Sequence, residues 1–293
     1  MPAKILEGGN LRGKIIDEVK AGLKKLSFLS GKIKLIAVQV GSHPSSEIYL
    51  NRQREAVSDL GLLYEVKALP ESIDESGLSD VISGLNLDKT VTGIIIQMPL
   101  PGNLPAGKIQ SMISPSKDVE GITPVNLGSM VLGRPVIVPP TAAAAAELLK
   151  YTGIDLKGKE VVIVSHSEIV GKPLSLLLLA SLDSSPTVTV CHIATSDLSY
   201  HTRKADVLFT AAGKPMLITE DMVKPEAVVI DIGINRIFSS EGKTKIAGDV
   251  DFDKVKDKVS WITPVPGGVG PLTVSMLMKN LLECARLQNS AIL

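Results

Sequence analysis

Apolar residues in the first half of the chain alternate between two spacings. A set of them recurs at helical spacing, namely Leu11, Ile15, Ile16, Val19, Leu23 and Leu26. An apolar run with the length of a buried strand follows this set. The alternation then repeats, which predicts helices over 48–60 and 76–85 and strands over 35–40, 64–69 and 93–97. Helices that alternate with strands indicate a largely parallel sheet.

A stretch dense in proline and glycine, residues 98–140, separates this half from a second alternation and is predicted to be loop. We expect Thr141 to cap the alanine-rich helix that follows. Further along, the pattern predicts helices over 171–180 and 271–287 and strands over 161–164, 187–191, 207–210 and 228–232. This order is typical of a doubly wound parallel sheet.

The predicted fold class is therefore α/β, with two α/β domains of which the second is Rossmann-like. At 293 residues the chain is long enough for two separate cores. We expect one domain over 1–140, to which a C-terminal helix over 271–293 returns, and a dinucleotide-binding domain over 141–270.

Charge and composition exclude several kinds of partner. Lys plus Arg and Asp plus Glu number 31 each and aromatic residues make up 3%, so no basic, aromatic-rich surface for nucleic acid is expected. The first residues lack a secretory pattern and no apolar run approaches the roughly 20 residues of a membrane span, so we expect a cytoplasmic protein without a membrane partner. Cys191 and Cys284 lack metal-ligand spacing, and we expect no metal.

The turn after the predicted strand 161–164 is the first candidate for ligand binding. Residues 165–173 join this strand to a helix, whose N-terminal N–H groups can bind a pyrophosphate. The three-glycine dinucleotide fingerprint is absent, so the loop alone is a modest signal. Two more small-residue turns, 211–213 and 231–233, follow later strands at the edge where open sheets bind ligands. The alternative is that their glycines only relieve backbone strain.

Several motifs together carry a resemblance to a known family. They are Tyr49, Gln-Met-Pro-Leu-Pro at 97–101, Asp-Val-Glu-Gly at 118–121, Ser-Glu-Ile-Val-Gly-Lys-Pro at 167–173 and Pro-Val-Pro-Gly-Gly-Val-Gly-Pro-Leu-Thr at 264–273. With them the chain resembles methylenetetrahydrofolate dehydrogenase/cyclohydrolase over nearly its whole length. The resemblance implies that 5,10-methylenetetrahydrofolate is oxidised with NADP or NAD and that the methenyl product is hydrolysed to 10-formyltetrahydrofolate. It also implies a homodimer with folate in a cleft between the domains.

The resemblance assigns roles to particular residues. The implied catalytic residues are Tyr49, Gln53, Gln97 and Glu120. Folate binding is implied for Tyr49, Gln97, Pro99, Leu100, Glu120, Pro264, Gly267 and Gly268. Cofactor binding is implied for Ser165, His166, Ser167, Ile169, Val170, Gly171, Pro173, His192, Ile193, Ala212, Gly213, Ile232, Gly233 and Thr273.

The chain departs from the family at positions that carry chemistry. Tyr49 and Gln53 lie four apart on one helix face, where the family has Tyr-x-x-x-Lys and uses the lysine for proton transfer and water activation. An amide has no proton that titrates near neutral pH, so Gln53 cannot act as a general acid or base. Arg52 and Arg54 lie on other faces and are interpreted as solvated charges. Glu120 replaces the usual aspartate, which keeps a carboxylate on a longer stem.

The cofactor loop departs from the family too. His166 and Ile193 stand where members that use a 2′-phosphate often have arginine and serine, and Ser165 replaces the first glycine of the loop. A neutral imidazole and an isoleucine bind an anion poorly, although His192 or Lys172 could compensate. These changes weaken the case for NADP and leave NAD, or weakened binding, open.

Three functions fit these observations. The first is an active dehydrogenase with weak or absent cyclohydrolase activity, because hydride transfer needs alignment more than a titratable lysine. The second is a catalytically inactive folate- or dinucleotide-binding paralogue with a regulatory role, since a fold alone does not secure a function. The third is a dehydrogenase of another cyclic amine or one-carbon carrier.

Overall fold

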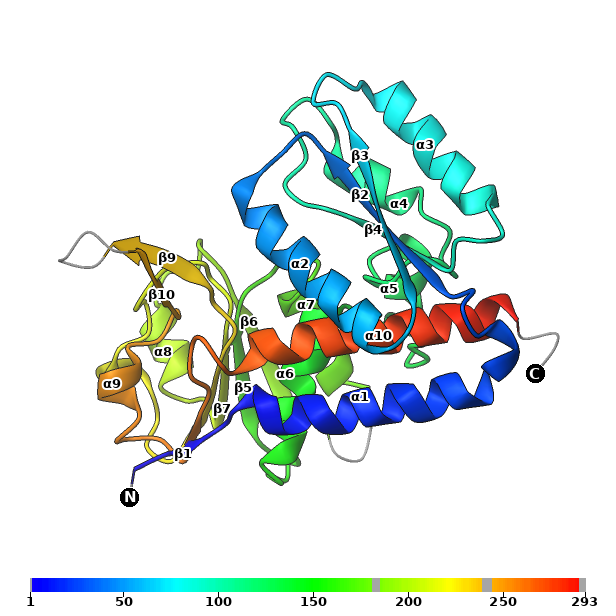
Figure 1. The fold of residues 1–293 in the computed structure, drawn as a ribbon. Helices are drawn as coiled ribbons and strands as arrows, with labels where there is room; N and C mark the ends of the chain where they lie inside the picture. Colours follow the sequence, from blue (N-terminus) through cyan, green and yellow to red (C-terminus); the bar gives the residue numbers. More distant parts are fainter. Residues whose placement is uncertain (1, 181–184, 239–243, 290–293) are drawn as a thin grey trace. The chain divides into compact units, whose positions relative to one another are not determined.

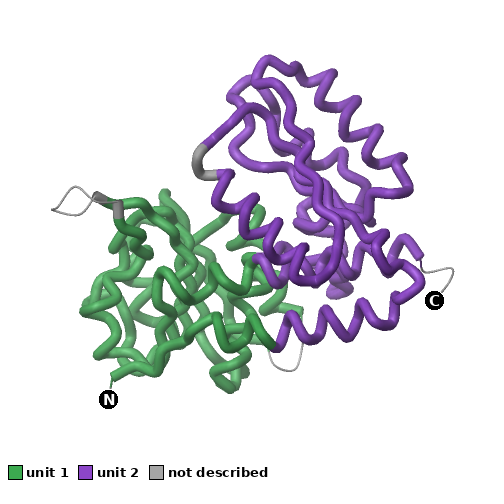
Figure 2. Tube along the Cα trace, viewed as in Figure 1, with its two compact units in different colours: residues 1–13, 141–273 green, residues 14–140, 274–293 purple. Residues whose placement is uncertain are grey.

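The computed structural model describes residues 2–180, 185–238 and 244–289, which form two compact units (Figure 2). Unit 1 comprises residues 1–13 and 141–273, and unit 2 comprises residues 14–140 and 274–293. The boundaries differ from the predicted ones at both ends. Residues 1–13 join unit 1 because the short strand β1 (Lys4–Ile5) pairs with β11 (Trp261–Ile262) of that unit. The second difference is that unit 1 extends to residue 273, into the last helix.

Unit 2 is built on a parallel sheet of three strands in the order β3-β2-β4 (Figure 1). The strands are β2 (Lys34–Val40), β3 (Leu63–Leu69) and β4 (Gly93–Ile96), and the helices that carry most of the packing are α1 (Gly8–Lys25), α2 (Pro44–Asp59), α3 (Glu75–Leu87) and α10 (Val269–Gln288). The predicted strands and helices of this half are all present. Residues 27–29 add one turn of 3-10 helix.

Alternate residues of β2 face opposite sides of this sheet, as the pleat requires. Leu35 and Ala37 pack into one core with residues of α1, α2 and α10, and Ile36 and Val38 pack into another with residues of α3. In α10, Val274, Leu277, Met278, Leu281, Leu282, Cys284 and Ala285 belong to the first of these cores. The last helix thus supplies a large part of the core on this face of the sheet.

The proline- and glycine-rich stretch is not only loop. Two short helices interrupt it, α4 (Ala106–Ser111) and α5 (Pro124–Val131), so the loop prediction is wrong there. Pro124 occupies the first turn of α5, where its missing N–H costs nothing. The predicted cap at Thr141 is also wrong. Helix α6 (Pro140–Tyr151) begins one residue earlier, at Pro140, so Thr141 lies within its first turn.

Unit 1 contains a parallel sheet of six strands in the order β1-β11-β8-β7-β5-β6. Its predicted strands are β5 (Glu160–Val164), β6 (Thr187–Cys191), β7 (Val207–Thr210) and β8 (Val228–Asp231). Helix α7 (Gly171–Leu178) joins β5 to β6, α8 (Leu198–Thr202) joins β6 to β7, and α9 (Phe252–Val255) precedes β11. An antiparallel hairpin of β9 (Asn235–Phe238) and β10 (Thr244–Ala247) and a 3-10 turn over Glu220–Met222 complete it. The doubly wound prediction is confirmed, and β1, β11 and the hairpin are additions.

Across residues 2–180, 185–238 and 244–289, no helix has both the length and the apolar character needed to cross a membrane.

Candidate functional site

Unit 2 gathers a group of polar side chains at the end of its sheet. Gln53, on α2, has no exposed surface, and its Oε1 accepts a hydrogen bond from the hydroxyl of Tyr64 at 2.9 Å. Gln97, directly after β4, donates to the same oxygen from Nε2 at 3.4 Å. Tyr49 lies one helical turn before Gln53 on the same face of α2. The structure thus brings Gln53 and Gln97 into contact, with Tyr64 from β3 as a partner that the sequence analysis missed.

Glu120 belongs to the same neighbourhood. Burial, and then the negative charge of Asp118, raise the pKa of the Glu120 carboxyl to about 8. The pKa of Tyr49 is also raised, first by burial and then by the charge of Glu120, so its hydroxyl stays protonated and can donate. The four predicted catalytic residues therefore form one group.

The loop that carries Glu120 is shaped by Asp118. The carboxylate of Asp118 accepts hydrogen bonds from the backbone N–H of Glu120 at 3.2 Å, from the N–H of Thr123 at 2.8 Å and from Asn126 Nδ2 at 2.8 Å. Gly121 has a φ of +64°, and a side chain there would press on the backbone near Val138. Asp118 and Gly121 thus fix the loop that carries Glu120.

Two polar atoms of this group are buried without a hydrogen-bond partner, Gln53 Nε2 and Glu120 Oε2. Leaving such atoms unpaired costs about 1–3 kcal/mol each, so they are rare in native proteins unless a ligand or water completes them. One is a donor and the other is an acceptor when ionised. The arrangement fits a ligand that offers both an acceptor and an N–H donor.

The other residues expected at the folate site lie in different surroundings. Pro99 is exposed, while the Leu100 side chain is packed in the core beneath the sheet. Pro264, Gly267 and Gly268 lie in unit 1, where the N–H of Gly268 donates to Pro264 O at 2.8 Å and Gly267 has a φ of +119°. These three residues therefore lie in a tight turn.

The predicted cofactor loop of unit 1 joins β5 to α7. Ser167 Oγ accepts from the N–H of Val170 at 3.2 Å and lies 3.3 Å from Ser165 Oγ. A side chain at Gly171 would overlap the carbonyl group of Ser165, so only glycine allows the loop to approach the start of α7 this closely. Pro173 follows in the first turn, and Ile169 is exposed. A dinucleotide phosphate fits such a loop at the start of a helix.

The two histidines beside this loop lie together. The rings of His166 and His192 stack with centroids 4.9 Å apart at 29°. His192 Nδ1 accepts a hydrogen bond from the N–H of Ala194 at 3.2 Å. Lys172 pairs with Glu168 at 2.6 Å, and Ile193 is fully exposed. The ends of β5 and β6 thus carry two aromatic rings and an apolar side chain.

The remaining predicted cofactor residues lie at the ends of β7 and β8 and in α10. The N–H groups of Ala212 and Gly213 donate to Asp249 Oδ2, at 2.6 and 3.2 Å, and the N–H of Gly233 donates to Asp231 Oδ1 at 2.9 Å. Ile232 is buried, and Thr273 Oγ1 lies 3.4 Å from Val269 O. These amides are held by carboxylates that the sequence analysis did not single out.

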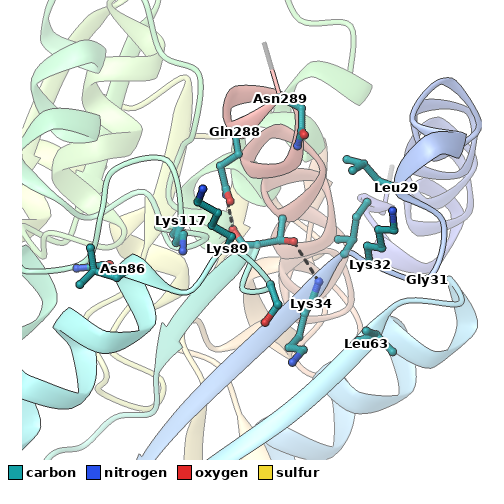
Figure 3. Close-up of a pocket in the computed structure, with 14 residues that line it drawn as sticks. Leu29, Gly31, Lys32, Lys34, Leu63, Asn86, Lys89, Lys117, Gln288 and Asn289 are labelled. Atoms are coloured by element: carbon teal, nitrogen blue, oxygen red, sulfur yellow. Dashed lines mark hydrogen bonds between the residues drawn. The ribbon is translucent and has the colours of Figure 1, made fainter. Parts of the chain in front are cut away.

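A separate hollow of about 890 Å³ opens at the opposite, amino-terminal edge of the unit 2 sheet (Figure 3). Its lining includes Lys32, Lys34, Lys89 and Lys117 but none of the predicted site residues. Lys117 Nζ donates to the carbonyls of Leu85 and Asp88 at the end of α3, at 3.0 and 2.7 Å. A lysine at this place donates to carbonyls that have no partner within the helix, and its positive charge interacts favourably with the helix dipole. We therefore interpret Lys117 as structural.

Comparison with known proteins covers both units. The family model described as the catalytic domain of tetrahydrofolate dehydrogenase/cyclohydrolase matches residues 6–120, and the model of its NAD(P)-binding domain matches residues 139–289. Bifunctional protein FolD 2 from Mesorhizobium japonicum is 47% identical over 278 residues, which are 95% of this chain and 90% of that protein.

Two solved structures are similar throughout. The bifunctional enzyme FolD, methylenetetrahydrofolate dehydrogenase/cyclohydrolase, from Campylobacter jejuni has a TM-score of 0.91 and 41% identity, with 97% of this chain and 99% of that chain covered. The Trypanosoma brucei enzyme of the same name, complexed with NADP cofactor and inhibitor, has a TM-score of 0.90 and 32% identity, with 100% and 99% covered. The similarity therefore extends over the whole chain.

Proposed function

Because this chain belongs to the tetrahydrofolate dehydrogenase/cyclohydrolase family, we propose that it oxidises 5,10-methylenetetrahydrofolate to 5,10-methenyltetrahydrofolate with a nicotinamide dinucleotide. The observation that carries the proposal is the buried group of Tyr49, Gln53, Gln97 and Glu120, with one unpaired donor and one unpaired acceptor. A pterin ring has both N–H donors and ring-nitrogen acceptors, which match these atoms.

In this proposal each side chain has a role in holding folate. Ionised Glu120 accepts hydrogen bonds from the N–H groups of the pterin, and Tyr49 stays protonated and donates. Gln97 and Tyr64 fix the amide of Gln53 so that its Nε2 is left for the ligand. The dinucleotide, when bound, accepts the hydride, and the protein's contribution is alignment and electrostatics.

The cyclohydrolase step is proposed to be weak or lost. The Mesorhizobium japonicum and Campylobacter jejuni relatives are named bifunctional, and we expect the present chain to differ from them in activity because of residue 53. Gln53 lies at the centre of the polar group, where its amide can bind but cannot exchange a proton near neutral pH. Hydrolysis of the methenyl ion requires an activated water. Of the neighbours of Gln53, Gln97 is an amide and burial raises the pKa of both Tyr49 and Tyr64, so none of the three supplies a base at neutral pH.

The proposed activity is tested by mixing the purified protein with 5,10-methylenetetrahydrofolate and NAD or NADP in turn. We expect reduced dinucleotide and methenyltetrahydrofolate to appear together in equal amounts. Absence of both products with either dinucleotide would reject the proposal and favour a binding protein. We also propose a cytoplasmic homodimer, as the family resemblance implies, and sedimentation of the purified protein would test the dimer.

We propose that NAD is preferred over NADP, because the side chains described at the ends of β5 and β6 are poorly suited to bind a 2′-phosphate. Lys172 there is paired with Glu168, and Ile193 cannot donate a hydrogen bond. The double substitution His166→Arg with Ile193→Ser should shift the ratio of kcat/KM for NADP over NAD upward by about 10- to 100-fold. Steady-state kinetics with both cofactors measures this ratio. An unchanged ratio would show that the adenosine ribose does not lie at this edge.

A further inference from the structure

Asp249 gathers the backbone amides of the turn that follows β7. Its Oδ2 accepts from the N–H groups of Ala212 at 2.6 Å and Gly213 at 3.2 Å, and its Oδ1 accepts from the N–H of Lys214 at 3.0 Å. Three consecutive N–H groups therefore converge on one carboxylate, which has no exposed surface. Such charge-assisted bonds are stronger than neutral ones, so the conformation of the turn depends on Asp249.

The same carboxylate is tied to the next strand and to the hairpin. Asn235 Nδ2, at the start of β9, donates to Asp249 Oδ1 at 2.8 Å. Asp231, the last residue of β8, accepts from the N–H groups of Gly233, Asp249 and Val250 at 2.9–3.1 Å and from the hydroxyl of Thr210 at 3.1 Å. The ends of β7 and β8 are thus joined through two buried carboxylates.

The two glycines beside these carboxylates have a role in the packing. A side chain at Gly233 would overlap the carboxylate of Asp249, and one at Gly248 would overlap that of Asp231. The φ of neither residue is in the left-handed region, so the backbone itself does not demand glycine. The space left by Gly233 is therefore occupied by Asp249, which explains this glycine without a ligand.

We infer that Asp249 is a positioning residue for the dinucleotide: it fixes the 211–214 turn and the end of β8, and so sets the surface that these segments present at the carboxyl edge of the sheet. The inference rests on the proposed function, since it assumes that this edge binds the cofactor, as it does in open α/β sheets. It also implies that the N–H groups of Ala212 and Gly213 are engaged by Asp249, so the turn contacts the dinucleotide through its other groups.

The test is Asp249→Asn. The amide keeps one acceptor oxygen but places an NH₂ group against N–H donors, so the turn should shift. We expect the KM and the dissociation constant for the dinucleotide to rise by about tenfold or more, with the KM for folate unchanged and kcat at saturation within about threefold. Binding is measured by calorimetry with NADH and NADPH, which requires no turnover.

A matched control is Asp206→Asn. Asp206 lies at the opposite edge of the same sheet, where it accepts from the N–H of Glu160 at 3.0 Å and pairs with Lys224 at 2.6 Å. If general loosening of unit 1 raised the dinucleotide KM, Asp206→Asn would raise it too. If Asp249→Asn does not fold, Gly213→Ala gives a second test, because Gly213 has a φ of +67° and a side chain strains the turn without touching the carboxylate.

The outcomes separate this inference from the proposed function. Selective loss of dinucleotide binding in Asp249→Asn supports the inference even if the wild type does not oxidise folate. The inference would be overturned if Asp249→Asn changed both KM values and kcat equally, or if Asp206→Asn had the same effects. It would also be overturned if the wild type bound neither NADH nor NADPH.

Discussion

Replacing Gln53 with lysine is expected to raise the hydrolysis of 5,10-methenyltetrahydrofolate by roughly 10²- to 10⁴-fold, the usual contribution of a positioned general acid or base. The side chain is completely buried among Gln97 and Tyr64, and an amine desolvated in this position has a pKa below its ordinary value. It can then exchange protons with a water near neutral pH. The decay of methenyl absorbance, followed without dinucleotide, measures the rate.

The matched control for this gain is Gln53→Met, which has a similar length and no titratable group. It should leave hydrolysis at the wild-type level, so an equal gain in both variants would attribute the effect to repacking. Rapid hydrolysis by the wild type would contradict the proposed loss of the second activity, because it would require a base other than residue 53.

Glu120→Gln is expected to lower kcat/KM for folate by roughly 10- to 100-fold and to remove a pH dependence centred near 8. In the wild type the pKa of Glu120 is about 8, so ionisation is incomplete at pH 7 and folate must bind to the ionised fraction. The wild-type KM for folate should therefore fall as the pH rises through 8. Kinetics from pH 6 to 9 would show this, and a wild-type profile that is flat over this range contradicts the assigned role.

Glu120→Gln should also change how the free energy of unfolding depends on pH. The folded protein binds the Glu120 proton up to about pH 8, whereas the unfolded chain releases it near the ordinary value of 4.5. The folded state thus binds more protons within this window, and the free energy of unfolding falls as the pH rises through it. Glu120→Gln removes this term, so the variant should be more stable than the wild type at pH 9 and similar to it below pH 4.5. Thermal unfolding at several pH values measures the difference.

Periodic segments of the chain were predictable because burial on a sheet or helix face dictates residue type. The run 35–40 is apolar on both faces of β2, and the later strands of unit 1 follow the same rule. Strands β1 and β11 have only two residues each, too short to show a period. The density of proline and glycine over 98–140 predicts loop, but Pro124 and Pro140 each occupy the first turn of a helix.

The candidate site was predictable only where local spacing or a motif marks it. Tyr49 and Gln53 share a helix face, so their proximity followed from the sequence. Tyr64 contacts Gln53 from another element, and the pairing of β2 with β3 that places it there is not local information. Asp249 likewise reaches Gly213 across 36 positions, and in the sequence it was simply another acidic residue.

The division of the chain into units also constrains the order in which each can be completed during synthesis. All six strands of the unit 1 sheet have been made once Ile262 leaves the ribosome. Unit 2 has its three strands much earlier, yet its main core needs residues up to Ala285 of α10. Until then the apolar face formed by Leu35, Ala37 and Ile95 stays incompletely covered, so the half of the protein that is made first is the last to reach its final packing.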